Sequence, residues 1–137
     1  MPKTRKFEAP RRKPSASELA FFKSRPDVAG MASGGAVVLN PYSPLSAREK
    51  EAVVVNETAR VLMQQRPEYQ PKFDITPQQE ERFAGYGSPQ NVRDTIAARI
   101  VSGDPSAGRP TFAQNEISRR IARLMGVSFT PRGGGGQ

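Results

Sequence analysis

Apolar residues recur at helical spacing in three stretches of the chain, over residues 46–66, 88–102 and 111–126. In the second stretch, Val92, Ile96 and Ile100 are spaced four residues apart, which places all three on one face of an α-helix. Each stretch therefore predicts an amphipathic helix with one buried face.

Capping residues indicate where these helices begin and add two shorter ones. A Ser or Thr followed three residues later by Glu or Gln forms a capping box, in which each side chain bonds the other residue's backbone N–H. The spacing occurs at Ser15–Glu18, Ser46–Glu49, Thr76–Gln79 and Thr111–Gln114. Ser88 precedes a proline, which suits the first helical position. These signals predict helices over residues 15–25, 46–66, 76 to 85 or 87, 88–102 and 111–126.

The segments between the helices are rich in proline and glycine. Ala36–Leu39 is the best strand candidate, and the short segment Lys72–Ile75 is its expected partner. The sequence therefore predicts a mainly α fold, a small bundle of three to four short helices with long loops and at most a two-stranded β patch.

Two apolar groups extend beyond the predicted core faces. Val54 and Val61 form a second stripe almost opposite the main one on the helix over residues 46–66, and Leu19 and Phe22 lie three residues apart on the first helix. Because a helix that is apolar on two sides is usually covered on two sides, these four residues are candidates for contact with a protein partner.

The composition predicts a small core. Leu, Ile, Val and Phe together number 27 of the 137 residues, and Pro and Gly number 25. The chain has no Cys, so disulfides and thiolate metal sites are excluded, and it has no His, the commonest general base. No apolar run approaches the ~20 residues of a membrane span, and no apolar region suited to a signal peptide follows the basic start. We therefore expect neither an enzyme nor a resident cofactor or metal.

The net charge of +8 is concentrated at the two ends of the chain. Residues 1–26 have a net charge of +6 and residues 111–137 of +3, whereas the middle is close to neutral. This pattern predicts a basic arm over 1–26, an extended Pro/Gly-rich segment over 27–45, a helical module over 46–127 and a flexible tail over 128–137. The candidates for contact with a polyanion are Arg5, Lys6, Arg11, Arg12, Lys13, Arg119 and Arg123.

Two segments come near to known functional motifs. Gly103–Thr111 has the glycine spacing of a phosphate-binding P-loop, but Arg109 and Pro110 occupy the positions of the required Lys and Ser or Thr. Ile121–Ser128 resembles the first helix and turn of a helix-turn-helix unit, yet Pro131 and four glycines stand where a recognition helix should follow. We therefore interpret the first as a helix–helix connection and the second as a helix ended by glycine.

These features favour a non-enzymatic structural or assembly subunit of a large particle, and we expect a bacteriophage virion component located in the virion or the host cytoplasm, neither in a membrane nor secreted. Its partners would be other protein subunits, with DNA or RNA bound through the basic arms and no small-molecule substrate. The alternatives are a free nucleic-acid-binding protein of the nucleoid or regulatory kind, and a ribosome-associated protein.

Overall fold

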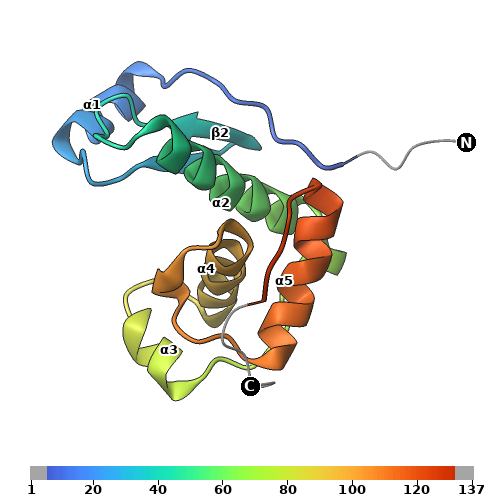
Figure 1. The fold of residues 1–137 in the computed structure, drawn as a ribbon. Coiled ribbons are helices and arrows are strands. Elements are labelled where there is room, and N and C mark those ends of the chain that lie inside the picture. Colours follow the sequence, from blue (N-terminus) through green and yellow to red (C-terminus); the bar gives the residue numbers. More distant parts are fainter. Residues whose placement is uncertain (1–5, 132–137) are drawn as a thin grey trace, which may run out of the picture.

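The computed structural model describes residues 6–131. Over this range the chain forms five α-helices, two 3-10 helices and one antiparallel pair of strands (Figure 1). In chain order the elements are α1 (Ala16–Ser24), β1 (Gly30–Ser33), β2 (Ala36–Leu39), α2 (Ala47–Gln65), η1 (Pro67–Tyr69), α3 (Pro77–Arg82), α4 (Pro89–Ser102), η2 (Pro105–Ala107) and α5 (Phe112–Met125). The predicted mainly α fold and the two-stranded patch are both confirmed.

The predicted helix starts are confirmed by their hydrogen bonds. At the start of α2, Ser46 Oγ accepts from the Glu49 N–H at 3.2 Å, and Glu49 Oε1 accepts from the Ser46 N–H at 3.1 Å. The same reciprocal pair forms at the starts of α1, α3 and α5. At the other end, α4 and α5 stop at glycines with φ of 76° and 70°, a conformation that glycine adopts without strain. The helix α3 ends at Arg82, earlier than predicted.

The helix α2 lies between two parts of the molecule (Figure 1). One side of it contacts the β-hairpin, and the other contacts α4 and α5. The largest cluster of buried residues joins α2, α4 and α5, with Leu62, Ile96 and Ile121 each at most 1% exposed. Burying such a side chain stabilises a fold by roughly 1.5–3 kcal/mol, so this cluster holds the three helices together.

The predicted strand partner was wrong. β2 pairs with β1, with Met31 opposite Val38 and a tight turn at the two glycines between the strands. Residues 72–75 form no strand. Two side chains of α4 hold this part of the chain instead. Gln90 Nε2 donates to the Pro71 carbonyl, and Arg93 Nε donates to the Phe73 carbonyl.

The basic segment before α1 is not a free arm over the residues that the structure describes. The Val37 N–H donates to the Pro10 carbonyl at 2.8 Å, and the Arg12 N–H donates to the Val37 carbonyl at 3.1 Å, so the segment extends the hairpin edge. Further back, the Phe7 N–H donates to the Leu124 carbonyl at 2.7 Å, and the Phe7 ring packs against the main core. Residues 6–14 therefore connect the hairpin to the end of α5.

The protein itself covers part of the second apolar stripe of α2. Val61 is 1% exposed, and Val54 is half-buried in a hollow that it shares with residues 6–9. Phe22 is completely buried, and Leu19 is half-buried beside it on α1. The expectation that these side chains are available to a partner is therefore wrong for Phe22 and Val61, whereas Leu19 and Val54 are partly exposed.

Candidate polyanion-binding face

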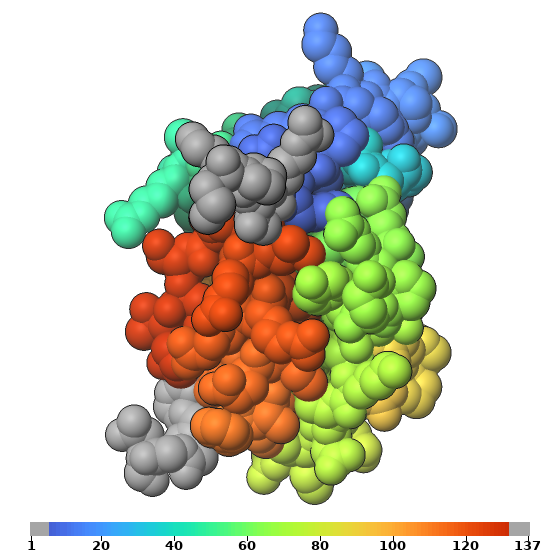
Figure 2. All heavy atoms as spheres, turned by 90° about the vertical axis from the view of Figure 1, so that its right-hand side faces the viewer, coloured from blue at the N-terminus to red at the C-terminus, as the bar shows by residue number. Residues whose placement is uncertain are grey.

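Three arginines occupy the outward side of α5. Arg119, Arg120 and Arg123 fall within one arc of this helix, opposite the side that buries Ile121 and Met125. Figure 2 shows this face: α5 is in orange and red toward the viewer, the segment after α2 lies beside it in yellow-green, and the N-terminal segment lies above it in blue.

Basic side chains from three separated segments surround these arginines. Arg66 precedes η1, Lys72 and Arg120 line one small hollow between η1 and α5, and Lys6 lies against Gly126 at the end of α5. We call the six residues Lys6, Arg66, Lys72, Arg119, Arg120 and Arg123 the α5 basic face. The neighbouring acids are Glu8, Glu68 and Glu116, so the face and its surroundings have a net charge of +3.

Three of these arginines lie over aromatic rings. The guanidinium carbon of Arg66 lies 5.7 Å from the centre of the Phe7 ring, that of Arg119 lies 5.5 Å from Phe129, and that of Arg120 lies 5.9 Å from Tyr69. A cation over the face of an aromatic ring is attracted by the ring's electrons. The rings therefore favour these positions of the three guanidinium groups.

The ion pairs of the face are few and weak. Arg119 Nε lies 3.7 Å from Glu116 Oε1, and Lys6 Nζ lies 3.6 Å from Glu8 Oε1, both between largely exposed groups. Exposed pairs of this kind contribute little to stability and are screened by salt. Among the described residues, Arg66, Arg120 and Arg123 make no ion pair. The described acidic residues therefore neutralise only part of the positive charge of the face.

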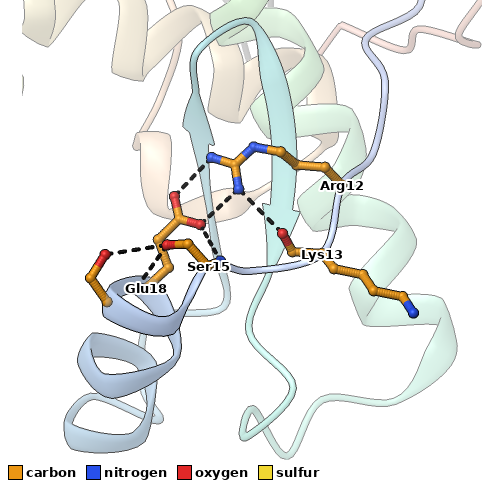
Figure 3. A network of polar contacts seen from close by, with 5 residues as sticks. Arg12, Lys13, Ser15 and Glu18 are labelled. Carbon is orange, nitrogen blue, oxygen red and sulfur yellow. Dashed lines mark hydrogen bonds and ion pairs between the residues drawn. The ribbon is translucent and has the colours of Figure 1, made fainter.

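The other predicted polyanion candidates have different surroundings. Arg12 donates to both carboxylate oxygens of Glu18 at 2.7 and 2.8 Å and also to the Lys13 carbonyl (Figure 3). Arg11 donates to Glu51 at 3.3 Å. Lys13 is exposed near them, and Arg5 lies outside the described residues. Of the seven predicted candidates, the α5 basic face contains Lys6, Arg119 and Arg123.

Sequence reasoning missed the contributions of Arg66, Lys72 and Arg120 to this face. Arg66 follows a helix and Lys72 stands in a loop, so neither belongs to a charge cluster along the chain. Arg66 could have been selected as a basic residue next to a proline that ends a helix. Its contact with the Phe7 ring could not have been predicted, because the two positions are 59 residues apart in the sequence. Only the folded chain brings them together.

The segment that resembles a P-loop forms a helix–helix connection, and the segment that resembles a helix-turn-helix unit forms a helix ended by glycine. Residues 104–111 contain η2, the Asp104 carboxylate accepts from the Ser106 N–H at 2.9 Å, and Thr111 caps α5. At the end of α5, the Val127 N–H donates to the Ala122 carbonyl and the described residues that follow form no helix. The predicted tail begins in contact with the protein, because Phe129 packs on the core; residues 132–137 lie outside the described range.

Two half-buried carboxylates lie apart from this face, between α2 and its neighbours. Burial raises the pKa of Glu57, although Arg60 at 3.9 Å and the Ala32 N–H favour its charged form. Burial also raises the pKa of Asp94, which accepts a hydrogen bond from Gln90. Among the described residues, no three acidic side chains come together as a metal site. The Glu57 carboxylate thus links α2 to β1, whereas the hydrogen bond of Asp94 lies within α4.

No family model, no curated protein and no solved structure matches this chain. Between residues 6 and 131, none of the helices has the length and apolar composition that crossing a bilayer requires. The class of ligand must therefore be inferred from the chemistry of the α5 basic face. An arginine cluster with a net positive charge is suited to phosphate groups, because a guanidinium matches two phosphate oxygens at once.

Proposed function

We propose that this protein is a non-enzymatic structural subunit of a nucleoprotein particle and that its α5 basic face contacts the phosphate backbone of nucleic acid. The observation that carries the proposal is the clustering of Arg66, Arg119 and Arg120 on one face, each over an aromatic ring. The attraction of each ring for its guanidinium favours one position of the side chain, so less side-chain entropy is lost on binding.

The surroundings of the face support a backbone contact rather than reading of base sequence. The outward arc of α5 is short, and no second helix follows it within the described residues to enter a major groove. Arginine contacts with phosphates position a protein on nucleic acid without specifying a sequence. A bacteriophage virion remains the kind of particle that the sequence predicts, and a free nucleoid or ribosome-associated protein remains the alternative.

The test is a titration of fluorescently labelled DNA at several salt concentrations with the full chain and an Arg120→Gln/Arg123→Gln variant. We expect weaker binding by the variant, and a reduction of about two in the slope of log affinity against log salt, if each arginine neutralises one phosphate. A matched control is Lys23→Gln/Arg48→Gln, which removes the same charge from exposed positions outside the face.

If both variants lost the same DNA affinity, binding would reflect net charge alone. If neither variant lost affinity, the α5 basic face would be rejected as the binding surface. Polyglutamate serves as the competitor. If it displaces DNA at equal charge concentration, the face is better assigned to an acidic protein surface.

A further inference from the structure

A groove of about 520 Å³ lies between α3 and the start of α5. It is lined by Thr76, Gln78, Gln79, Arg82, Gly108, Arg109, Pro110, Thr111 and Phe112. Two of these residues are arginines and none is acidic. Arg82 therefore favours an anionic group in the occupant of this groove, and the groove is large enough for more than a simple ion.

The wall of the groove that contains Arg82 is fixed in place. Arg82 Nη1 donates to the Ser106 carbonyl at 3.1 Å, and a Cβ added at Gly108 would lie 3.8 Å from Arg82 Nε. Gly108 has φ of 82°, a conformation that disfavours any side chain there, and the Arg82 guanidinium lies beside it at ordinary contact distance. One N–H of Arg82 is used by this contact, and others remain available at the groove.

Phe112 gives the groove an aromatic side. It is the first residue of α5 and is 67% exposed, more than any other large hydrophobic residue described. An exposed ring beside arginines is the combination that binds unpaired bases, because a base stacks on the ring while its phosphate meets the cation. A base inside a duplex is already stacked and cannot use the ring in this way.

We propose that this groove holds one unpaired nucleotide of single-stranded nucleic acid, with its base on Phe112 and its phosphate beside Arg82. The inference rests on the proposed function, because it makes single strands the preferred ligand of the same surface. Phe112 lies on the outward side of α5, as do Arg119 and Arg123, so a strand that follows this side of the helix reaches the groove. Glu116, between them, is paired with Arg119.

Phe112→Trp provides a direct test, since the chain contains no other tryptophan. We expect the fluorescence of the introduced indole to be quenched by a 12-nucleotide thymidine strand, and to change little with a strand of equal length whose sugars lack bases. The duplex of the thymidine strand with its complement should bind without comparable quenching.

Phe112→Ala tests the energetic role of the ring. We expect it to weaken the affinity for the thymidine strand on the order of tenfold, because one base loses its stacking on the ring. The affinity for the duplex should stay within about twofold of that of the natural chain. The slope against salt should not change, because no charge is removed. Phe112 is largely exposed, so the variant should retain the helical far-ultraviolet spectrum of the natural chain.

The outcomes separate this inference from the proposed function. Binding that depends on Arg120 and Arg123, but shows neither quenching nor an effect of Phe112→Ala, overturns the single-nucleotide site and leaves the α5 basic face intact. Absence of DNA binding by the natural chain rejects both. Equal quenching by polyglutamate would assign the groove to an acidic peptide and reject the nucleotide.

Discussion

Gln79 and Gln114 hydrogen-bond each other through both of their side-chain amides, at 2.8 and 2.7 Å. Each is also the third residue of its helix and completes a capping box, so each amide oxygen accepts a backbone N–H at the start of its own helix. The pair is buried, and Gln114 donates additionally to the Asp74 carbonyl at 3.0 Å. The two capping boxes are thus linked through glutamines that are 35 residues apart in the sequence, and this contact places the starts of α3 and α5 side by side.

Replacing Gln114 should therefore be costly. Gln114→Ala removes a cap and leaves the Gln79 amide buried without its partner, and we expect the free energy of unfolding to fall by about 2–4 kcal/mol. Urea denaturation followed by circular dichroism measures the change. The control is Gln78→Ala, an exposed neighbour on α3, which should change stability by less than about 0.5 kcal/mol. Equal effects of the two variants would contradict the importance of the amide pair.

Asn40 joins α1 to the hairpin. Its buried Nδ2 lies 3.1 Å from the Arg25 carbonyl and 2.6 Å from the Val28 carbonyl, and its Oδ1 accepts from the Tyr42 N–H at 2.8 Å. Asn40→Ala removes these three bonds, of which the Arg25 carbonyl keeps a second one from the Val28 N–H, and we expect a loss of about 2–3 kcal/mol in the free energy of unfolding.

Chemical denaturation of Asn40→Ala should be compared with Asn40→Asp, which keeps an acceptor for Tyr42 but cannot donate. If donation to the carbonyls dominates, both variants are destabilised. A stable Asn40→Asp variant would show instead that the Tyr42 bond dominates.

Phe7 tests whether the N-terminal segment belongs to the fold. Its ring is half-buried against the core and lies under Arg66, so we expect Phe7→Ala to reduce the free energy of unfolding by about 1–2 kcal/mol. Lys13→Ala, in the same segment but exposed, should have little effect. If Phe7→Ala were as stable as the natural chain, residues 6–14 would behave as a free arm.

Glu18 should make stability depend on pH. The bidentate bond from Arg12 and the Ser15 N–H lower the pKa of Glu18 to about 2 (Figure 3). Because this pKa lies below the ordinary value of 4.5, the carboxylate stabilises the fold above pH 4.5, and this stabilisation is lost as the pH falls toward 2.

Glu18→Gln keeps an acceptor for Ser15 and removes the charge. The difference in unfolding free energy between the natural chain and this variant, from urea titrations at several pH values, should be positive at pH 7 and shrink toward pH 2. In an Arg12→Met background the difference should be smaller at pH 7, because the cation has gone. A difference that does not vary with pH would contradict the assignment.

The candidate site divides into parts that were predictable and parts that were not. Arg119 and Arg123 were identified because their spacing alone puts them on the polar side of an amphipathic helix. The same reasoning treated Arg11 and Arg12 as available to a polyanion, whereas Glu51 and Glu18 pair with them in the fold. The sequence gives the number of cationic side chains in a segment. It does not show which of these side chains pair with a carboxylate in the folded protein.

The sequence by itself determined where the helices begin and which face of each is buried. Ser46 with Glu49 and Thr111 with Gln114 act across three residues, and apolar periodicity repeats within a turn, so both signals are complete in the local chain. Tertiary structure decided which strand pairs with β2, that residues 6–14 cover part of α2, and that Phe7, Tyr69 and Phe129 meet arginines. These contacts join segments that no local pattern connects, because shape and burial across the whole fold select them.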